Sequence, residues 1–146
     1  MTLPLVYAHR GASAYAPENT LLSFQKAVDM NADGVELDIQ LTKDGEIVVI
    51  HDEWLDRTSN GTGWVKDYTL EELKKLEFNQ NFPELGHASI PTMQEVLDLL
   101  KPTKLRIDIE LKTGIVFYEG LEEKILKLVK DNDMESRVEY SSFNHY

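Results

Sequence analysis

The sequence predicts an α/β fold with a mainly parallel sheet, because strand-like and helix-like segments alternate along the chain. The strand-like segments Val35–Leu41 and Leu105–Leu111 alternate apolar with polar residues at a period of two. One side of each is therefore charged, whereas an open sheet covered by helices on both faces needs strands that are apolar on both sides. A barrel explains this pattern, since apolar side chains then face outer helices and charged ones face the mouth, where active sites lie.

The N-terminal part predicts a strand, a helix and a second strand. Leu5–Ala8 is short and apolar, Pro17-Glu18-Asn19-Thr20 opens a helix, and Asp33-Gly34 closes it. The second strand is Val35–Leu41. The apolar face of the helix carries Leu21, Phe24, Ala27 and Val28.

A hairpin is predicted next. Asp44-Gly45 is a turn signal between Val35–Leu41 and an apolar strand at Ile47–Ile50. A parallel crossover needs about a dozen residues, so strands this close in sequence must pair antiparallel. Folding about the turn brings His51 beside Glu36 and Leu37.

Residues 53–89 are irregular and rich in turn formers, and we expect them to form a small insertion in a single domain over residues 1–146. Capping-box pairs predict two short helices, one after Thr69 and one after Thr92. Trp54 and Trp64 either line a pocket or pack the small core of the insertion, and packing is the favoured reading. A longer helix over Leu121–Val129 and a last strand at Val138–Phe143 follow.

The composition limits the classes of function. The chain has 146 residues, 42% of them apolar, and a formal net charge of −11. Such a surface repels polyanions, so nucleic acid and anionic membranes are poor partners. Without cysteine there are no disulfides or thiolate metal sites. No signal peptide and no apolar run of roughly 20 residues is visible, which predicts a cytoplasmic protein with no stable membrane insertion.

Three acids are candidates for a metal site. Glu36, Asp38 and Glu110 lie on the charged sides of two strands, and a gathering of three carboxylates favours a bound cation. Oxygen ligands favour Mg²⁺ or Ca²⁺ over Zn²⁺. The alternative is that these strands are solvated on one side and the acids are ordinary surface.

Other polar residues at strand ends could take part in chemistry. His9 and His51 are candidate acids or bases near neutral pH, and Arg10 is a permanent cation suited to a phosphate. Lys112 directly follows the strand that carries Glu110. Each could instead be a surface residue, and His51 could simply bond to Asp52. His87 and His145 are interpreted as surface residues.

Taken together, these segments resemble the glycerophosphodiester phosphodiesterase family over essentially the whole chain. Each fragment alone is unspecific, but their order is specific. The matching fragments are His9-Arg10-Gly11, Pro17-Glu18-Asn19-Thr20, Glu36-Leu37-Asp38, Thr42-Lys43-Asp44-Gly45, His51-Asp52, Ile90-Pro91-Thr92, Glu110-x-Lys112 and Ser141-Ser142-Phe143.

The resemblance implies a TIM-type barrel and hydrolysis of glycerophosphodiesters to an alcohol and glycerol 3-phosphate. It implies that the acids Glu36, Asp38 and Glu110 bind a divalent cation and that His9 and His51 form the acid–base pair. Arg10 and Lys112 resemble the phosphate-binding positions. The attacking group is either a glycerol hydroxyl of the substrate, through a cyclic phosphate, or water.

A barrel of this type typically needs about 250 residues, and this chain ends roughly where a fifth strand would finish. We therefore expect only the N-terminal portion of the barrel, with exposed strand edges that favour association into homo-oligomers. Two further functions stay open. One is a non-catalytic fragment that binds a cation, glycerophosphate or a partner, and the other is a related phospholipase-type phosphodiesterase.

Overall fold

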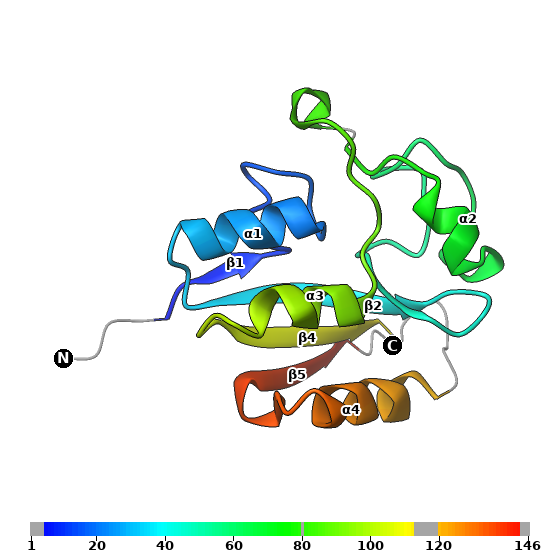
Figure 1. Cartoon of the computed structure of the whole chain (residues 1–146). Coiled ribbons are helices and arrows are strands. Elements are labelled where there is room, and N and C mark those ends of the chain that lie inside the picture. Colours follow the sequence, from blue (N-terminus) through cyan, green and yellow to red (C-terminus); the bar gives the residue numbers. More distant parts are fainter. Residues whose placement is uncertain (1–4, 80, 113–119, 144–146) are drawn as a thin grey trace.

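The computed structural model describes residues 5–79, 81–112 and 120–143, and the side chains of Lys112, Ser142 and Phe143 lie outside that description. Strands and helices alternate as predicted (Figure 1). The strands are β1 (Tyr7–His9), β2 (Gly34–Leu41), β3 (Ile47–Val49), β4 (Arg106–Lys112) and β5 (Val138–Phe143). The helices are α1 (Leu21–Asp29), α2 (Leu70–Lys74), α3 (Met93–Leu100) and α4 (Leu121–Asp131), with 3₁₀ turns at Val65–Asp67, Pro83–Leu85 and Glu135–Arg137.

All five strands belong to one sheet with the order β1-β2-β4-β5, and β3 pairs with β2 outside this path. The strands on the path pair in parallel, whereas β3 runs antiparallel to β2 as the predicted hairpin. The last strand is therefore the fifth in sequence but only the fourth parallel one. A closed barrel of the TIM type has eight.

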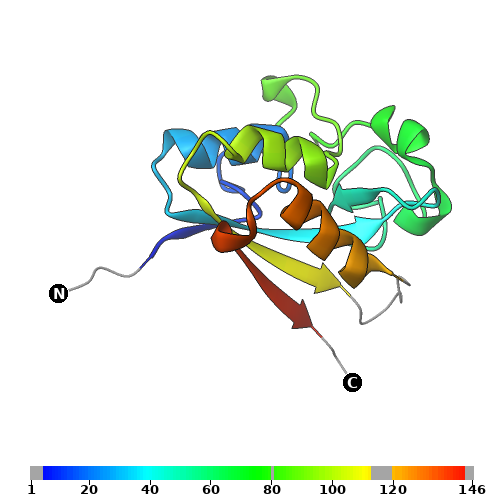
Figure 2. The ribbon, with the colours of Figure 1, turned by 60° about the horizontal axis from the view of Figure 1, so that its bottom comes forward.

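The sheet has one face covered by helices. Figure 2 shows α1, α3 and α4 on the same side of the sheet, and the described ranges place no helix on the other side. Val35, Leu37 and Ile39 of β2 contribute fully buried side chains to the core between sheet and helices. The acids Glu36 and Asp38 alternate with them and face the other way. This is the arrangement expected for a segment of a barrel, with helices outside and polar residues inside.

The boundaries of α1 differ from the prediction at both ends. Thr20 is the N-cap, and its hydroxyl donates to the carbonyl of Pro17 over 2.6 Å, so Pro17 and Glu18 precede the helix in a turn. Asn19 cannot be helical because its φ is +54°. At the other end the left-handed Asn31 stops the helix, and the Asp33-Gly34 pair leads into β2 instead.

The insertion at residues 53–89, called the insert below, has its own small core. Both capping boxes form as predicted, at Thr69 and at Thr92. The rings of Trp54 and Trp64 contact each other at a tilt of 42° with centroids 4.4 Å apart, and Trp54 stays 38% exposed. Neither tryptophan belongs to the buried cluster of this region, which consists of Val48, Ile50, Leu55, Val65, Leu73, Phe78 and Ile90. The expectation that they pack this core was therefore wrong.

Strand β3 connects the two cores. Its residues Ile47 and Val49 pack into the main core. Val48 and the following Ile50 pack into the core of the insert. Since neighbouring side chains of a strand point to opposite faces, β3 is apolar on both sides.

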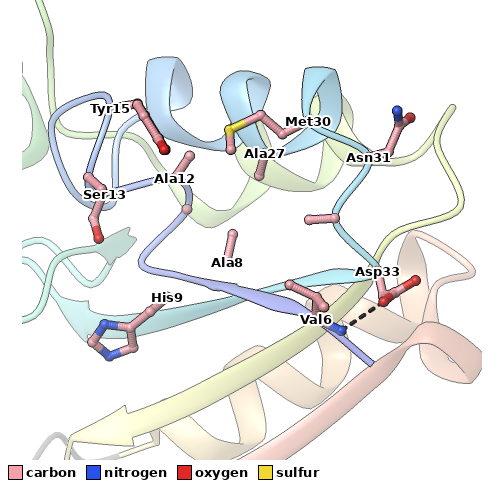
Figure 3. Close-up of a pocket in the computed structure, with 13 residues that line it drawn as sticks. Val6, Ala8, His9, Ala12, Ser13, Tyr15, Ala27, Met30, Asn31 and Asp33 are labelled. Atoms are coloured by element: carbon pink, nitrogen blue, oxygen red, sulfur yellow. Dashed lines mark hydrogen bonds between the residues drawn. The ribbon is translucent and has the colours of Figure 1, made fainter. Parts of the chain in front are cut away.

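The two outer parallel strands have open edges within the part of the chain that is described. β1 pairs only with β2, and β5 pairs only with β4. Beside β1 lies an apolar groove of about 420 Å³ between this strand and α1, flanked by the exposed Val6, Tyr15 and Met30 (Figure 3). These exposed apolar residues agree with the edges predicted for an incomplete barrel. None of the helices in the described ranges has the length and apolarity to cross a membrane.

Candidate active site

Three carboxylates converge on the face of the sheet opposite the helices. Glu36 and Asp38 lie on β2, and Glu110 lies on β4 directly opposite Asp38 in the strand pairing. Residues two apart on a strand share a face, so the in-register pairing gathers all three. One ligand oxygen from each lies within 4.8 Å of those of the others. We call these residues the acid cluster.

Asp38 is the centre of the acid cluster. It is fully buried, and its Oδ2 accepts a hydrogen bond of 3.1 Å from Nδ2 of Asn19 and lies 3.8 Å from Nε of Arg10. Burial, the adjacent carboxyl group of Glu110 and the charge of Glu36 together raise the pKa of Asp38 to about 8. Burial, followed by the charge of Glu110, also raises the pKa of Glu36. Without a cation this cluster therefore resists full ionisation.

Two buried oxygens of this region lack hydrogen-bond partners in the described part of the chain. They are Oδ1 of Asp38 and Oδ1 of Asn19, and both residues are at most 3% exposed. An unsatisfied buried acceptor costs free energy, and two of them beside like charges need a compensating positive group. Carboxylate and amide oxygens are the ligands of hard divalent cations. The residues present thus fit a divalent cation.

The loop between β1 and α1 wraps around the acid cluster. The backbone N–H of Arg10 donates to Oε2 of Glu36 over 3.3 Å, and its carbonyl accepts from the N–H of Asn19 over 2.8 Å. Arg10 has a φ of +54°, a conformation that residues other than glycine adopt at an energetic cost. Gly11 follows with a φ of +75°, and a Cβ there would lie 2.8 Å from the backbone carbonyl carbon of Ser23. Only glycine fits this crossing of loop and helix.

His9 and Arg10 direct polar groups toward the acid cluster. Nε2 of His9 lies 3.2 Å from Oε2 of Glu36, and the side chain of His9 is 67% exposed. Figure 3 shows that Ala8 points toward α1 and the groove, whereas His9 points to the opposite side of β1. The groove lies mainly on the helix side of β1, and His9 is also among the residues that line it. The guanidinium of Arg10 donates from NH1 to Oε2 of Glu18 over 3.1 Å.

The predicted hairpin forms and places His51 directly after the segment that pairs with β2, while its position beside Glu36 stays a prediction. The pairing with β2 extends to Ile50, whose N–H donates to the carbonyl of Asp38 over 3.0 Å. Gln40 of β2 fixes the next turn of chain, because its amide nitrogen donates to the carbonyls of His51 and Asp52 over 3.0 and 2.8 Å. Nδ1 of His51 lies 2.8 Å from Oδ1 of Asp52.

Four polar residues of this region were missed as site residues in the sequence. Glu18 and Asn19 lie in a recognised motif but had no role, and Gln40 shares the polar side of β2 with the acids. The positions of these three residues could therefore have identified them from the sequence. No sequence pattern pointed to Arg57 of the insert. The side chain of Lys112 lies outside the described residues, so its predicted phosphate contact stays a prediction.

Comparisons with known proteins agree with this geometry. Residues 9–146 match the model of the glycerophosphoryl diester phosphodiesterase family. A glycerophosphodiester phosphodiesterase of Caldanaerobacter subterraneus is 54% identical over 143 residues, which make up 97% of this chain and 59% of that protein. One from Bacillus altitudinis is 48% identical and is covered to 58% of its length.

Solved structures show the same relationship. The fold matches a glycerophosphodiester phosphodiesterase of Agrobacterium tumefaciens with a TM-score of 0.87 and 35% identity, over 97% of this chain and 59% of the other. It also matches a phosphodiesterase of Oleispira antarctica in complex with the product sn-glycerol-3-phosphate, with a TM-score of 0.86, 35% identity and coverage of 98% and 59%. The chain thus spans somewhat less than three fifths of the proteins it resembles. Because the family model matches most of its length, the chain belongs to the glycerophosphoryl diester phosphodiesterase family.

Proposed function

We propose that the protein that contains this chain hydrolyses glycerophosphodiesters to an alcohol and glycerol 3-phosphate, with the help of a divalent cation. The observation that carries the proposal is the acid cluster, whose fully buried Asp38 has a raised pKa and an unpartnered Oδ1, with His9 in contact with Glu36 and Arg10 near the other oxygen of Asp38. The names of the relatives and the product bound to the Oleispira enzyme support the same reaction. The activity belongs to the whole protein, since the chain spans 59% of these relatives.

Glu36, Asp38 and Glu110 would hold the cation, and we propose Mg²⁺ or Ca²⁺ because every donor is an oxygen. When bound, the cation supplies positive charge that offsets the negative charge building on the phosphoryl oxygens. The side-chain amide oxygen Oδ1 of Asn19 is a further oxygen ligand of the same kind.

The remaining residues bind the phosphate and move protons. Arg10 would bind a phosphoryl oxygen with the part of its guanidinium that Glu18 does not hold, and Lys112 would do so from the end of β4. His9 and His51 would share proton transfer, one accepting the proton of the attacking hydroxyl and the other protonating the leaving alkoxide. Glu36 orients His9 through the 3.2 Å contact with Nε2, and Asp52 orients His51 through Nδ1.

A release assay tests the proposal. Glycerophosphocholine is incubated with the protein and with Mg²⁺ or Ca²⁺ in separate series, and glycerol 3-phosphate is measured. We expect activity that a chelator abolishes and that His51→Ala lowers by about 10²-fold or more. His87→Ala is the matched control, because His87 pairs with Glu77 on the surface of the insert. Chelator-resistant release, or equal losses in both variants, would contradict the assignment, and cation binding without release would favour the non-catalytic alternative.

A further inference from the structure

A continuous chain of ion pairs joins the phosphate-binding arginine to one of the histidines. It runs from Arg10 to Glu18, from Glu18 to Arg57, and from Arg57 to Asp52, which bonds to His51. Its members come from the loop before α1, from the end of the hairpin and from the insert. Arg10 and His51 at the two ends have roles in the proposed reaction, Asp52 orients His51, and Glu18 and Arg57 have no role in it so far.

Arg57 makes the central connection with four hydrogen bonds. NH1 and NH2 donate to Oε1 and Oε2 of Glu18 over 2.6 and 2.9 Å. Nε and NH2 donate to Oδ2 and Oδ1 of Asp52 over 2.9 and 3.0 Å. A guanidinium holds a planar carboxylate at two points, which fixes its orientation, and here one guanidinium does so for two carboxylates at once.

The orientation of Asp52 determines which nitrogen of His51 carries the proton. Oδ1 of Asp52 receives a hydrogen bond from Arg57 and lies 2.8 Å from Nδ1 of His51. Burial acts to raise the pKa of Asp52, but the hydrogen bonds from Arg57 and His51 outweigh it and lower this pKa to about 2. An ionised carboxylate only accepts, so neutral His51 must carry its proton on Nδ1. The other ring nitrogen, Nε2, is then the one that can accept a proton from substrate.

We propose that Arg57 is a positioning residue, which locks Asp52 between itself and His51 and so selects the Nδ1-protonated form of the histidine. The importance of Arg57 for catalysis rests on the proposed function, whereas its effect on the tautomer of His51 does not. Surface ion pairs contribute little to stability, and the side chain of Arg57 is 46% exposed. The effect of Arg57 therefore concerns the geometry of His51 more than the stability of the fold.

The test reads the histidine ring directly by ¹⁵N NMR of the 146-residue chain with labelled histidine, at a pH where His51 is neutral. In the wild type we expect the Nδ1-protonated pattern at His51. Asp52→Ala should move the signals toward the Nε2-protonated form, and Arg57→Met should move them in the same direction. The double variant should match Asp52→Ala alone, because Arg57 acts through Asp52.

Arg106→Met is the matched control. Arg106 is 42% exposed and pairs with a carboxylate, Glu139, on the outer part of the sheet, so its loss should leave the His51 signals unchanged. Arg57→Lys keeps the charge but cannot bind each of two carboxylates at two points, and it serves as the milder variant if Arg57→Met does not fold. A folded Arg57 variant with wild-type His51 signals, or a double variant that shifts further than Asp52→Ala, would overturn the proposal.

Turnover gives a second, separate reading. In the glycerophosphocholine assay we expect Arg57→Met to lower kcat by about 10- to 100-fold, as is typical when a partner of a site residue is lost. If no glycerophosphodiester is hydrolysed by the wild type, the proposed function fails while the ring signals still decide the role of Arg57. If a variant keeps the wild-type kcat although His51 has changed to its other tautomer, the tautomer is not important for catalysis.

Discussion

Replacement of Asp38 by asparagine tests whether the acid cluster is built for a cation. Asparagine has nearly the same shape and can still accept the hydrogen bond from Nδ2 of Asn19, but it carries no charge. We expect the variant to be more stable than the wild type when metal is absent at neutral pH. When a divalent cation is present, the advantage should shrink or reverse, since only the wild type keeps the complete ligand set.

The size of the effect follows from the pKa of Asp38, which the fold raises from 3.8 to about 8. A carboxyl with a raised pKa lowers stability as the pH rises from the unfolded value toward the folded one, because the unfolded chain ionises more readily. Between pH 3.8, which is the pKa of the carboxyl group in the unfolded chain, and pH 7, the folded state loses about 1.4 kcal/mol of stability per pH unit. The total loss at pH 7 is about 4 kcal/mol. This figure is an upper limit, because the surrounding structure relaxes around a charge that forms inside it.

The measurement is urea unfolding of both proteins at pH 4 and pH 7, with chelator and with Mg²⁺ or Ca²⁺. With chelator, the difference in unfolding free energy should be near zero at pH 4 and should approach the upper limit at pH 7. Cation at about 100 times its dissociation constant should add about 2.7 kcal/mol to the wild type. Asp98→Asn, which removes an exposed carboxylate from α3, is the control and should change stability by less than about 0.5 kcal/mol.

Two results would refute this reasoning. If Asp38→Asn is less stable than the wild type at pH 7 in chelator, then Asp38 is not a strained acid in the folded chain. If Mg²⁺ and Ca²⁺ both leave the wild type unchanged, then the three carboxylates do not form a cation site.

Three further perturbations have defined outcomes. Gly11→Ala should destabilise the chain by about 1–3 kcal/mol in urea unfolding, because its φ is +75° and the new Cβ would meet the backbone of Ser23; an unchanged midpoint would contradict that crossing. Leu73→Ala, in the fully buried core of the insert, should cost about 2–5 kcal/mol by the same measurement, and a loss below 1 kcal/mol would mean that this core is not packed as described. Asp52, with a pKa of about 2 against 3.8, stabilises the fold above pH 3.8 and loses that effect as the pH falls through 2. The stability advantage of wild type over Asp52→Asn should therefore decline by up to about 2 kcal/mol across this range at low salt, and a constant gap would refute the paired carboxylate.

The parts of the fold that were predicted from the sequence share one property, which is that local chemistry determines them. The alternating strands at β2 and β4, the hairpin after Leu41 and the capping boxes at Thr69 and Thr92 all follow from residues close in sequence. The gathering of the acid cluster also follows, once period two and parallel pairing are accepted. The resemblance to a family supplied the roles of these residues, which periodicity alone does not give.

Other features depended on contacts between segments that are distant in sequence. The start of α1 was misplaced because the turn before Thr20 is needed to put Asn19 beside Asp38, and helix propensity carries no information about that contact. Arg57 lies 39 residues from Glu18 in sequence, in a region without regular structure, so no pattern indicates their hydrogen bonds. The tryptophans were placed in the core of the insert because they lie in that irregular segment, whereas Trp54 packs on Trp64 at its surface.

The two apolar sides of β3 have a consequence for the histidine that follows it. A strand with a polar face cannot slip by one residue without burying that face, but β3 has no polar face to oppose such a slip. A slip by one residue would reverse the face of the sheet to which His51 points. The alignment is therefore set by polar contacts at the two ends of β3. Gln40 holds the carbonyl of His51 at one end, and at the other Thr42 and Glu46 exchange two hydrogen bonds of 2.9 and 3.0 Å around a left-handed Gly45. Loosening the turn at Gly45 would therefore shift His51 from a distance, with both cores still intact.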